Sequence, residues 1–334
     1  MHKVAVPLIL ISFVILASIT IALLIFRPMQ SSDTPIMFQI KPGRSSLLIA
    51  EDLAQKNLIR TPLAFNLLTR LTGTSRNLKA GTYRLSGAMN SLQIFYCLRE
   101  GKSIMRKFVV PEGKTLNQIA QIYEQSGFGS AEKFRQALNN PNWQVKHNIE
   151  SDFLEGYLFP DTYYFNDGIS AETVIQTMLI RSNQKWTDNM KKAAEAISMS
   201  RHDILTLASI IEMEAALPEE RTIISGVFHN RLRLRWRLDA DPTVIYGLGS
   251  PKRPLTKSDL KKDTPYNTYV HRGLPPGPIC NPGESCILAA LYPDDVPYFF
   301  FVAINNFSHH FSKSLQEHQR MIREIKRKKN LTRF

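Results

Sequence analysis

The longest apolar run in the chain lies at its N-terminus. No charged residue occurs from Val4 to Phe26, and a helix of that length, rising about 1.5 Å per residue, can cross a hydrocarbon core of about 30 Å. The run is longer than the apolar core of most signal peptides, and no clear cleavage site follows it. The pattern therefore favours an uncleaved membrane anchor over a cleaved signal peptide. Lys3 and Arg27 flank the run, so the charge rule barely decides its orientation.

An internal repeat follows the apolar run. The segment IKPGRSSLLIAEDL, which begins at Ile40, aligns without gaps with VPEGKTLNQIAQIY, which begins at Val110. The alignment matches Gly43 with Gly113. Each copy predicts a strand, a turn at the glycine and a short helix that packs isoleucine and alanine inward. Two copies are too few for a solenoid, so the repeat indicates a duplicated small module.

The rest of the chain has the patterns of both helices and strands. The segment 81–85 is typical of a short strand, and 92–98 of a helix that ends at Gly101. Helical patterns dominate 171–232, a further helix is expected at 285–291, and 298–303 has the composition of a buried strand. We expect an α+β fold with a membrane segment in residues 1–30, the duplicated module in 36–145 and a mixed α+β domain in 146–334.

Charge and cysteine content narrow the class of protein. The formal net charge is +13, from 42 basic and 29 acidic residues, which favours an anionic partner such as phospholipid, an acidic wall polymer or nucleic acid. Many basic residues crowd the C-terminus, which we interpret as a solvated, frayed tail. Cys97, Cys280 and Cys286 have no metal or redox spacing. We expect buried thiols, with a Cys280–Cys286 disulfide as the alternative.

One strongly apolar helix contains two carboxylates. Ser200 and Asp203 have the spacing of a capping box, and the residues after them are apolar nearly all round, so we expect this helix at the centre of its domain. Residues three and four positions apart share a helix face. The neighbours of Glu212 on its face are all small: Ala208, Ser209, Ala215 and Ala216. The neighbours of Glu214 are bulky or helix-breaking: Ile210, Ile211, Leu217 and Pro218.

Glu212 is therefore predicted to border open space where a substrate could lie, while Glu214 is predicted to be walled in or at a helix edge. A carboxyl group in an apolar groove can stay protonated near neutral pH, as a general acid for glycosidic cleavage must. The alternative for Glu212 is a structural ion pair with Arg221 or Arg231.

Glycosidic cleavage usually requires a second carboxylate. The candidates are Glu155, Asp161, Asp239 and Asp241. Asp241 precedes a proline, so it can instead bond its own backbone in a turn. The segment 231–238 alternates basic and apolar residues, which predicts an edge strand or helix end with four outward arginines, or a contact with acidic peptides or lipid head groups. The Tyr-, Asn- and Pro-rich segment 266–283 predicts a rigid loop that either binds sugars or wraps over the core.

Several motifs occur together and in order along the chain. They are Glu155-Gly-Tyr-Leu-Phe-Pro-Asp-Thr-Tyr, Leu207-Ala-Ser-Ile-Ile-Glu-Met-Glu, Val227-Phe-His-Asn-Arg-Leu, Asp241-Pro-Thr-Val-Ile-Tyr-Gly, Tyr266-Asn-Thr-Tyr and Gly273-Leu-Pro-Pro-Gly-Pro-Ile. This set resembles the YceG-like endolytic murein transglycosylases, the MltG family. The chain departs from the family at Met213-Glu214-Ala215, where a basic residue and then Glu-Thr are expected.

The resemblance implies a single-pass protein of the inner membrane, with a LysM-like region in 36–145 that binds glycan strands and a periplasmic catalytic domain in 146–334. It implies that Glu212 is the catalytic acid and base of a lytic transglycosylase, which leaves 1,6-anhydro ends. The muramic C6 hydroxyl is then the nucleophile, so no second carboxylate is needed. The residues expected to bind substrate are Asp241, Tyr246, Asn267, Tyr269, Asn230 and Glu155. No metal or cofactor is implied.

The partners expected from this resemblance are peptidoglycan glycan strands, inner-membrane lipid and peptidoglycan synthases, beside which the protein would terminate nascent strands. No nucleic-acid-binding motif accompanies the positive charge, so nucleic acid is disfavoured. Two alternatives remain open. One is a hydrolytic muramidase in which Asp241 or Asp161 activates water, and the other is a wall-binding scaffold without enzymatic activity.

Overall fold

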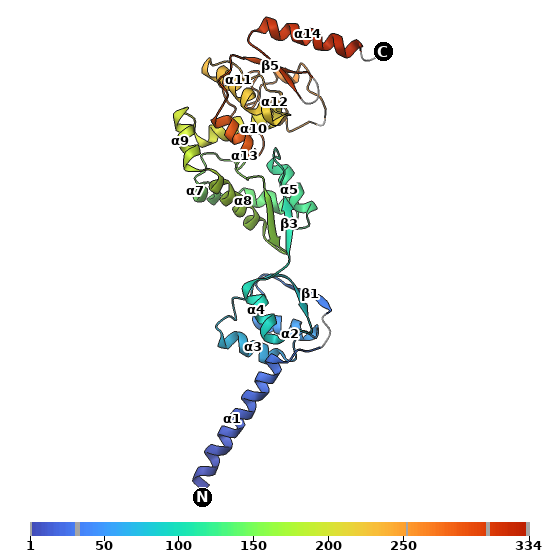
Figure 1. Ribbon diagram of the computed structural model, residues 1–334, viewed down its shortest axis with the longest axis vertical. Helices are drawn as coiled ribbons and strands as arrows, with labels where there is room; N and C mark the ends of the chain where they lie inside the picture. Colours follow the sequence, from blue (N-terminus) through green and yellow to red (C-terminus); the bar gives the residue numbers. More distant parts are fainter. Residues whose placement is uncertain (1, 31–33, 252, 305–307, 332–334) are drawn as a thin grey trace. The chain divides into compact units, whose positions relative to one another are not determined.

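A computed structural model describes residues 2–30, 34–251, 253–304 and 308–331. Of residues 2–12, 14 and 329–331 it describes the backbone alone. The chain forms two compact units, one of Met1–Phe108 with Tyr163–Ile169 and the other of Val109–Thr162 with Ser170–Phe334. Helices and short antiparallel strands occur in both, which confirms the predicted mixed α+β class (Figure 1).

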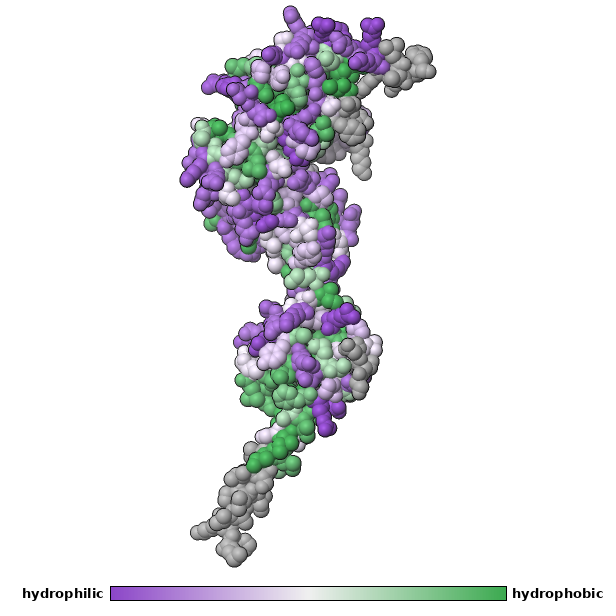
Figure 2. Space-filling model, viewed as in Figure 1, coloured by the Kyte–Doolittle hydropathy of each residue, from purple (hydrophilic) through white to green (hydrophobic). Residues whose placement is uncertain are grey.

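The N-terminal helix α1 spans His2–Phe26. The predicted anchor, Val4–Phe26, falls on this helix, but most side chains of its first half lie outside the described residues. The described half exposes large apolar side chains, among them Phe13, Leu16 and Leu23 (Figure 2). In the described part of the chain, no helix is both long enough and apolar enough to cross a membrane.

The core of the first unit is built around one antiparallel strand pair. Strand β1 (Pro35–Ile40) pairs with β2 (Gly81–Ser86), with Phe38 opposite Tyr83. Helices α2 (Ser46–Gln55) and α3 (Pro62–Leu71) lie between these strands in the sequence, and α4 (Ser91–Glu100) follows them. Side chains from the strands and helices, including Phe38, Leu53 and Phe95, form one buried cluster. Helix α4 ends at Gly101 with a φ of 74°, which confirms the predicted C-cap.

The second copy of the repeat has the predicted local structure. Strand β3 (Met105–Val109) pairs with β4 (Thr162–Asn166). Helix α5 (Leu116–Gln125) follows β3 after a turn, and α6 (Ala131–Leu138) and α7 (Asn142–His147) come next. Both turn glycines, Gly43 and Gly113, adopt positive φ angles of 78° and 74°, a conformation that glycine adopts without steric cost. The predicted strand, turn and helix are thus confirmed in both copies.

The second unit is organised around helix α10 (Arg201–Glu214). Ser200 and Asp203 form the predicted capping box, and every residue from Ile204 to Ile211 is buried, which confirms the central place of this helix. Its neighbours in space include α9 (Asp188–Ala196), α11 (Arg221–Arg233), α12 (Asp241–Gly247) and α13 (Glu284–Leu291) (Figure 1). Helix α8 (Ala171–Lys185) and the 3-10 turns η1 (Pro218–Glu220) and η2 (Asp259–Lys261) complete this part.

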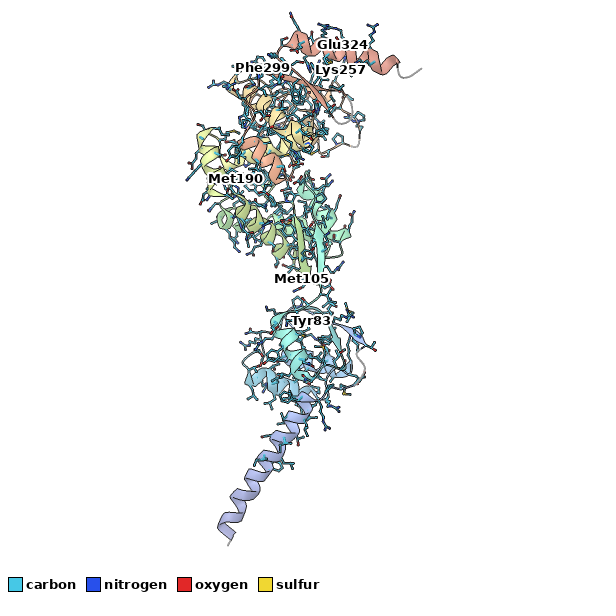
Figure 3. The ribbon with its side chains drawn as sticks, in the orientation of Figure 1. Tyr83, Met105, Met190, Lys257, Phe299 and Glu324 are labelled. Carbon is cyan, nitrogen blue, oxygen red and sulfur yellow. The ribbon has the colours of Figure 1, made fainter. Side chains whose placement is uncertain are left out.

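Two predictions for the C-terminal part need correction. Strand β5 (Phe300–Ala303) lies within the predicted strand and pairs with β6 (His309–Ser312), but it is only partly buried rather than buried. The basic tail is a helix, α14 (Leu315–Leu331), rather than a frayed segment. His318 of this helix stacks on Phe300 of β5. Glu324, labelled on the helix in Figure 3, pairs with Arg320 one turn away, and both contacts favour the helical form.

The alternating segment 231–238 was predicted to present four outward arginines. Instead α11 ends at Arg233, so the segment is the predicted helix end, and Arg231 is buried. The Arg231 guanidinium donates to the carbonyls of Phe299 at 2.7 Å and Leu238 at 2.6 Å. The prediction was wrong for this one arginine because two backbone carbonyls, one of them 68 positions away, satisfy its donors.

Truncating Leu53 should destabilise the first unit. Leu53 is fully buried in α2, so Leu53→Ala leaves a cavity and should lower the free energy of unfolding by about 2–5 kcal/mol. Leu63→Ala is a matched control on α3, since Leu63 is 77% exposed, and should cost under about 0.5 kcal/mol. Urea unfolding followed by circular dichroism measures both, and equal losses would contradict the described core.

Candidate active site

Glu212 lies in the last turn of α10, at the point where this buried helix reaches the surface. Its side chain is half-buried, and its Oε2 accepts a hydrogen bond from the backbone N–H of Gly283 at 2.9 Å. Within the described residues Glu212 makes no salt bridge with Arg221 or Arg231, because Arg231 is engaged by backbone carbonyls and by Asp239 at 3.8 Å. Glu212 is therefore a partly open carboxylate at the end of a rigid helix.

The open space predicted around Glu212 is only half present. Ala208 and Ser209 are fully buried, and Ser209 Oγ accepts from the N–H of Ile279 at 3.0 Å while its carbonyl lies 3.5 Å from the Cys280 thiol. The segment around Ile279 thus fills the space on that side. The helix ends at Glu214, and the small residues that follow it are not fully buried, so Glu212 can meet a substrate only from the C-terminal end of α10.

The N-terminus of α13 faces Glu212. Gly283 is the N-cap of this helix and has no capping side chain, so the Glu212 carboxylate bonds its free N–H. The positive end of a helix dipole favours a negative charge at such a position. Burial first, and then the charge of Glu212 and a hydrogen bond to it, raise the pKa of the Cys286 thiol. Cys286 therefore stays protonated and serves Glu212 as a second donor.

A second carboxylate, Glu112, lies at the same glycine. A Cβ atom on Gly283 would overlap the Glu112 carboxylate, and a Cβ on Gly113 would lie 3.5 Å from Glu212 Cγ. The turn that carries Glu112 is held there by a bridge between Lys114 and Asn281. Sequence reasoning missed Glu112. The repeat contained a signal for it: the position before the turn glycine is Pro42 in the first copy and the charged Glu112 in the second.

Two predictions were made for Glu214: that bulky neighbours enclose it, or that it lies at a helix edge. The second agrees with the structure. Glu214 is the last residue of α10 and only partly buried, yet desolvation and the nearby charge of Asp241 raise its pKa to about 7, against the opposing effect of Arg231. Asp241 is exposed at the start of α12, and its Oδ1 accepts from the Tyr269 hydroxyl at 2.7 Å. The structure thus brings the predicted Asp241 and Tyr269 together, next to Glu214. The Asp241 carboxylate therefore bonds a tyrosine from a distant loop, whereas the turn interpretation had it bond its own backbone.

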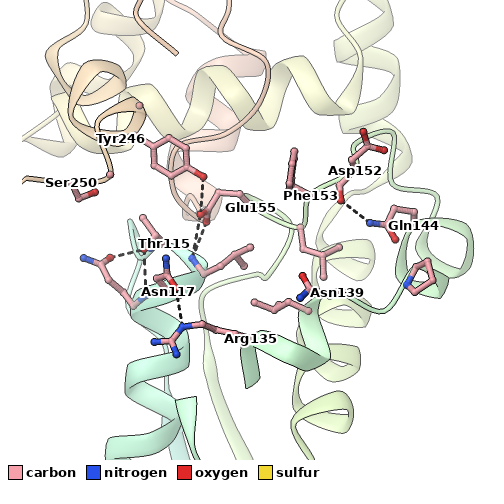
Figure 4. Close-up of a pocket in the computed structure, with 17 residues that line it drawn as sticks. Thr115, Asn117, Arg135, Asn139, Gln144, Asp152, Phe153, Glu155, Tyr246 and Ser250 are labelled. Carbon is pink, nitrogen blue, oxygen red and sulfur yellow. Dashed lines mark hydrogen bonds between the residues drawn. The ribbon is translucent and has the colours of Figure 1, made fainter. Parts of the chain in front are cut away.

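Glu155 and Tyr246 lie together on the wall of a large cavity of about 1140 Å³ (Figure 4). Glu155 is buried and accepts from the N–H of Leu116 at 3.0 Å, from Asn281 Nδ2 at 2.9 Å and from the Tyr246 hydroxyl at 3.2 Å. Burial raises the pKa of Glu155 to about 8, although these three hydrogen bonds act in the opposite direction. Glu212 does not line this cavity. Besides Glu155 and Tyr246, the polar wall of the cavity includes four amides, one arginine and a second carboxylate: Asn117, Gln118, Asn139, Gln144, Arg135 and Asp152.

Asn267 and Asn230 occupy supporting positions. Asn267 is fully buried, and its amide donates to the carbonyls of Leu260 and Lys262 at 3.2 and 2.8 Å. Asn230 donates in the same way to Val296 and Tyr298 at 2.7 and 3.0 Å. Both side chains hold loops in shape, so they can affect a substrate only through the residues that those loops carry.

Two further predicted groups are accounted for by local contacts. Asp161 forms an ion pair with Arg181 at 2.8 Å, and its pKa is lowered by hydrogen bonds from the N–H of Thr162 and from Arg181, which outweigh desolvation. Cys280 and Cys286 are separate buried thiols, as expected, rather than a disulfide, whereas Cys97, also expected to be buried, is only partly buried. Among the described residues no group of three or more His, Cys, Asp or Glu side chains could hold a metal ion.

Comparison with known proteins agrees with the motif pattern. The model of the YceG-like family matches residues 38–324. The chain belongs to the YceG-like family. This confirms the resemblance drawn from the motifs, and the match includes every carboxylate described in this site.

The chain is similar to named proteins and to a solved structure. A protein of Bacillus subtilis (strain 168) named endolytic murein transglycosylase is 35% identical over 312 residues, which cover 87% of this chain and 85% of that protein. A protein of the same name from Streptococcus pneumoniae D39 is 26% identical over 85% of this chain, but the match spans only 57% of that protein. A crystal structure of a yceG-like protein from Listeria monocytogenes is 37% identical with a TM-score of 0.59, and the match covers 87% of this chain and all of that one.

The buried Glu155 predicts a pH-dependent stability. Its pKa of about 8 in the folded chain lies above the ordinary value of 4.5, so its contribution is fully present below about pH 4.5 and is lost as pH rises through about 8. A difference of one in pKa between the folded and the unfolded chain corresponds to about 1.4 kcal/mol of stability. Glu155→Gln keeps the acceptor and cannot ionise, so it should match the wild type at pH 5 and exceed its unfolding free energy by a few kcal/mol at pH 9.

Denaturant titrations at pH 5, 7 and 9 would measure this difference. Glu155→Ala is the comparison variant, since it loses the three hydrogen bonds and should be less stable than Glu155→Gln at every pH. A Glu155→Gln variant whose stability runs parallel to that of the wild type across the range would contradict a raised pKa at this residue.

Proposed function

We propose that this chain is an endolytic lytic transglycosylase that cleaves the bond between N-acetylmuramic acid and N-acetylglucosamine in peptidoglycan, with Glu212 as its acid and base. The family and the names of the relatives support this activity. The assignment of Glu212 rests on the position of its side chain. It is a partly open carboxylate at the end of a buried helix, fixed by the Gly283 N–H at 2.9 Å, and no salt bridge holds it in the described part of the chain.

The chemistry needs one group that first gives and then takes a proton. Glu212 donates its proton to the glycosidic oxygen as the bond from that oxygen to muramic C1 breaks. The C6 hydroxyl of the same sugar attacks C1 and passes its proton to the Glu212 carboxylate. A 1,6-anhydro sugar and a free C4 hydroxyl result, no water is consumed, and Glu212 ends protonated as it began. The intramolecular nucleophile replaces a second catalytic carboxylate.

The glycan strand binds along the second unit in this proposal. The cavity beside Glu155 and Tyr246 offers amide donors and acceptors and the exposed ring of Phe153, which suit the hydroxyls and faces of sugars. Asp241 and Tyr269 contact sugar from the end of α10. Asn267 and Asn230 act indirectly, through the loops that they hold.

The remaining parts of the chain place the enzyme at its substrate. Residues 36–145 act as a LysM-like region that binds glycan strands, which their two strand–turn–helix copies support. Helix α1 anchors the chain in the inner membrane, with the catalytic part in the periplasm beside peptidoglycan synthases. There it ends the elongation of nascent strands.

One observation favours a second candidate. Burial and the charge of Asp241 raise the pKa of Glu214 to about 7, and Asp241 is exposed beside it. Two neighbouring carboxyl groups, one of them with a raised pKa, are the arrangement of a hydrolytic glycosidase. In a hydrolytic muramidase Glu214 would be the acid and Asp241 would activate water. This candidate differs from the first in its products and in the residue it requires.

Digestion of purified uncrosslinked glycan strands tests the proposal. The wild type should release fragments lighter by one water than hydrolytic ones, as read by mass spectrometry. Glu212→Gln should slow the release by about 10²-fold or more, because the amide can neither give nor take the proton. Glu219→Gln, at an exposed glutamate of η1, is the matched control and should cleave like the wild type.

Other outcomes identify the alternatives. Reducing ends of full mass, lost in Glu214→Gln and kept in Glu212→Gln, would replace the proposal by the hydrolytic muramidase. Folded protein that binds strands but never cuts them would indicate a scaffold.

A further inference from the structure

The mechanism proposed for strand cleavage by Glu212 gives no role to Glu112, the carboxylate beside it. Glu112 and Glu212 both approach Gly283: the Glu212 carboxylate bonds its N–H, and the Glu112 carboxylate occupies the space where a Cβ would stand. Two acidic side chains from segments far apart in the sequence thus meet at one backbone position. Like charges repel at such short range, so an arrangement that holds them together needs a physical cause.

Backbone contacts, rather than chance, place Glu112 there. The N–H of Gly113 donates to the Asn281 carbonyl at 2.9 Å, and the N–H of Asn281 donates back to the Lys114 carbonyl at 3.0 Å. Gly113 has a φ of 74°, which few residues other than glycine adopt, and only a glycine at 283 leaves room for the carboxylate. The turn is therefore built so that the side chain before Gly113 reaches Glu212.

The charges around this pair come from three helices. Arg221, at the start of α11, attracts Glu112, and its Nε is buried without a hydrogen-bond partner among the described residues. Cys286 of α13 is a neutral thiol bonded to Glu212. Glu284, also on α13, is paired with Lys185 of α8. Burial and then the charge of Glu212 raise the pKa of Glu112, and Arg221 only partly offsets them.

We propose that Glu112 is a positioning residue for the acid: its carboxylate, set beside Glu212 at the N-terminus of α13, keeps one proton on the pair until the glycosidic oxygen takes it. This inference rests on the proposed function of Glu212. The state in which both carboxylates are ionised is the costly one, so the pair retains a proton to higher pH than one carboxylate would.

The same repulsion assists both halves of the reaction. Before cleavage it keeps one proton on the pair, and Glu212 passes this proton to the glycosidic oxygen. After the proton has moved to the glycosidic oxygen, two carboxylates face each other, and the pair draws the proton of the C6 hydroxyl more strongly than a lone carboxylate. Over the whole cycle the pair gives up one proton and takes one back, so it ends as it began.

A pH–rate profile of strand cleavage by Glu112→Gln tests this role. The amide keeps the shape and removes the charge, so the alkaline limb of kcat/KM should move to lower pH by about one unit. Cleavage at pH 8 should then fall about tenfold, while cleavage at pH 5 should stay within about twofold of the wild type. Glu219→Gln is the control for loss of one negative charge nearby and should leave the limb in place.

Gly283→Ala is a second, independent variant. The φ of Gly283 is −75°, so alanine fits the backbone, and its Cβ should push the Glu112 carboxylate away from Glu212 while both charges remain in the chain. The alkaline limb should again move to lower pH.

The outcomes separate this inference from the proposed function. A Glu112→Gln profile that is lowered equally at every pH, or unchanged, would overturn the role of Glu112, provided that Glu212→Gln is inactive. An active Glu212→Gln would instead overturn the assignment of the acid itself.

Discussion

The side chain of Asn281 is the point on which the second unit's site depends. It is fully buried, and its Oδ1 accepts from the N–H of Leu158 at 2.9 Å while its Nδ2 donates to the Lys114 carbonyl and to Glu155 Oε1, each at 2.9 Å. One amide thus joins three segments that lie far apart in the sequence. A buried amide with its groups satisfied is rigid, and leaving its partners unpaired would cost about 1–3 kcal/mol for each.

The carboxylates near Asn281 lie in two very different environments. On one side of Asn281, Glu155 is buried and bonded on all sides, which makes it part of the framework of the cavity. By contrast, Glu212 is partly exposed in the last turn of α10, and Glu112 is exposed in the turn before Gly113. The buried Cys280, one residue before Asn281, lies within the electrostatic reach of both Glu155 and Glu212. The framework can therefore be rigid while Glu212 and Glu112 stay accessible.

Local signals in the sequence predicted the local structure well. Ser200 and Asp203 marked the start of α10, Gly101 marked the end of α4, and the repeated turn glycines marked both strand–turn–helix copies. In each case the residues that determine the backbone lie within a few positions of one another. The choice of Glu212 from its neighbours was only partly sound, because Ala208 and Ser209 pack against a distant loop. The repeat marked the position of Glu112 but not its approach to Gly283. The burial of Arg231 could not be foreseen, because one of its carbonyl partners, Phe299, lies 68 positions away.

The repeat has a consequence for how such a site can arise. A turn whose glycine takes a positive φ keeps its path whatever side chain precedes the glycine, and this chain has Pro42 before one such turn and Glu112 before the other. A substitution at that single position alters the chemistry without altering the fold. Duplication thus leaves one copy free to acquire a charge while the other keeps the original packing, and in this chain the second copy brings Glu112 against Gly283.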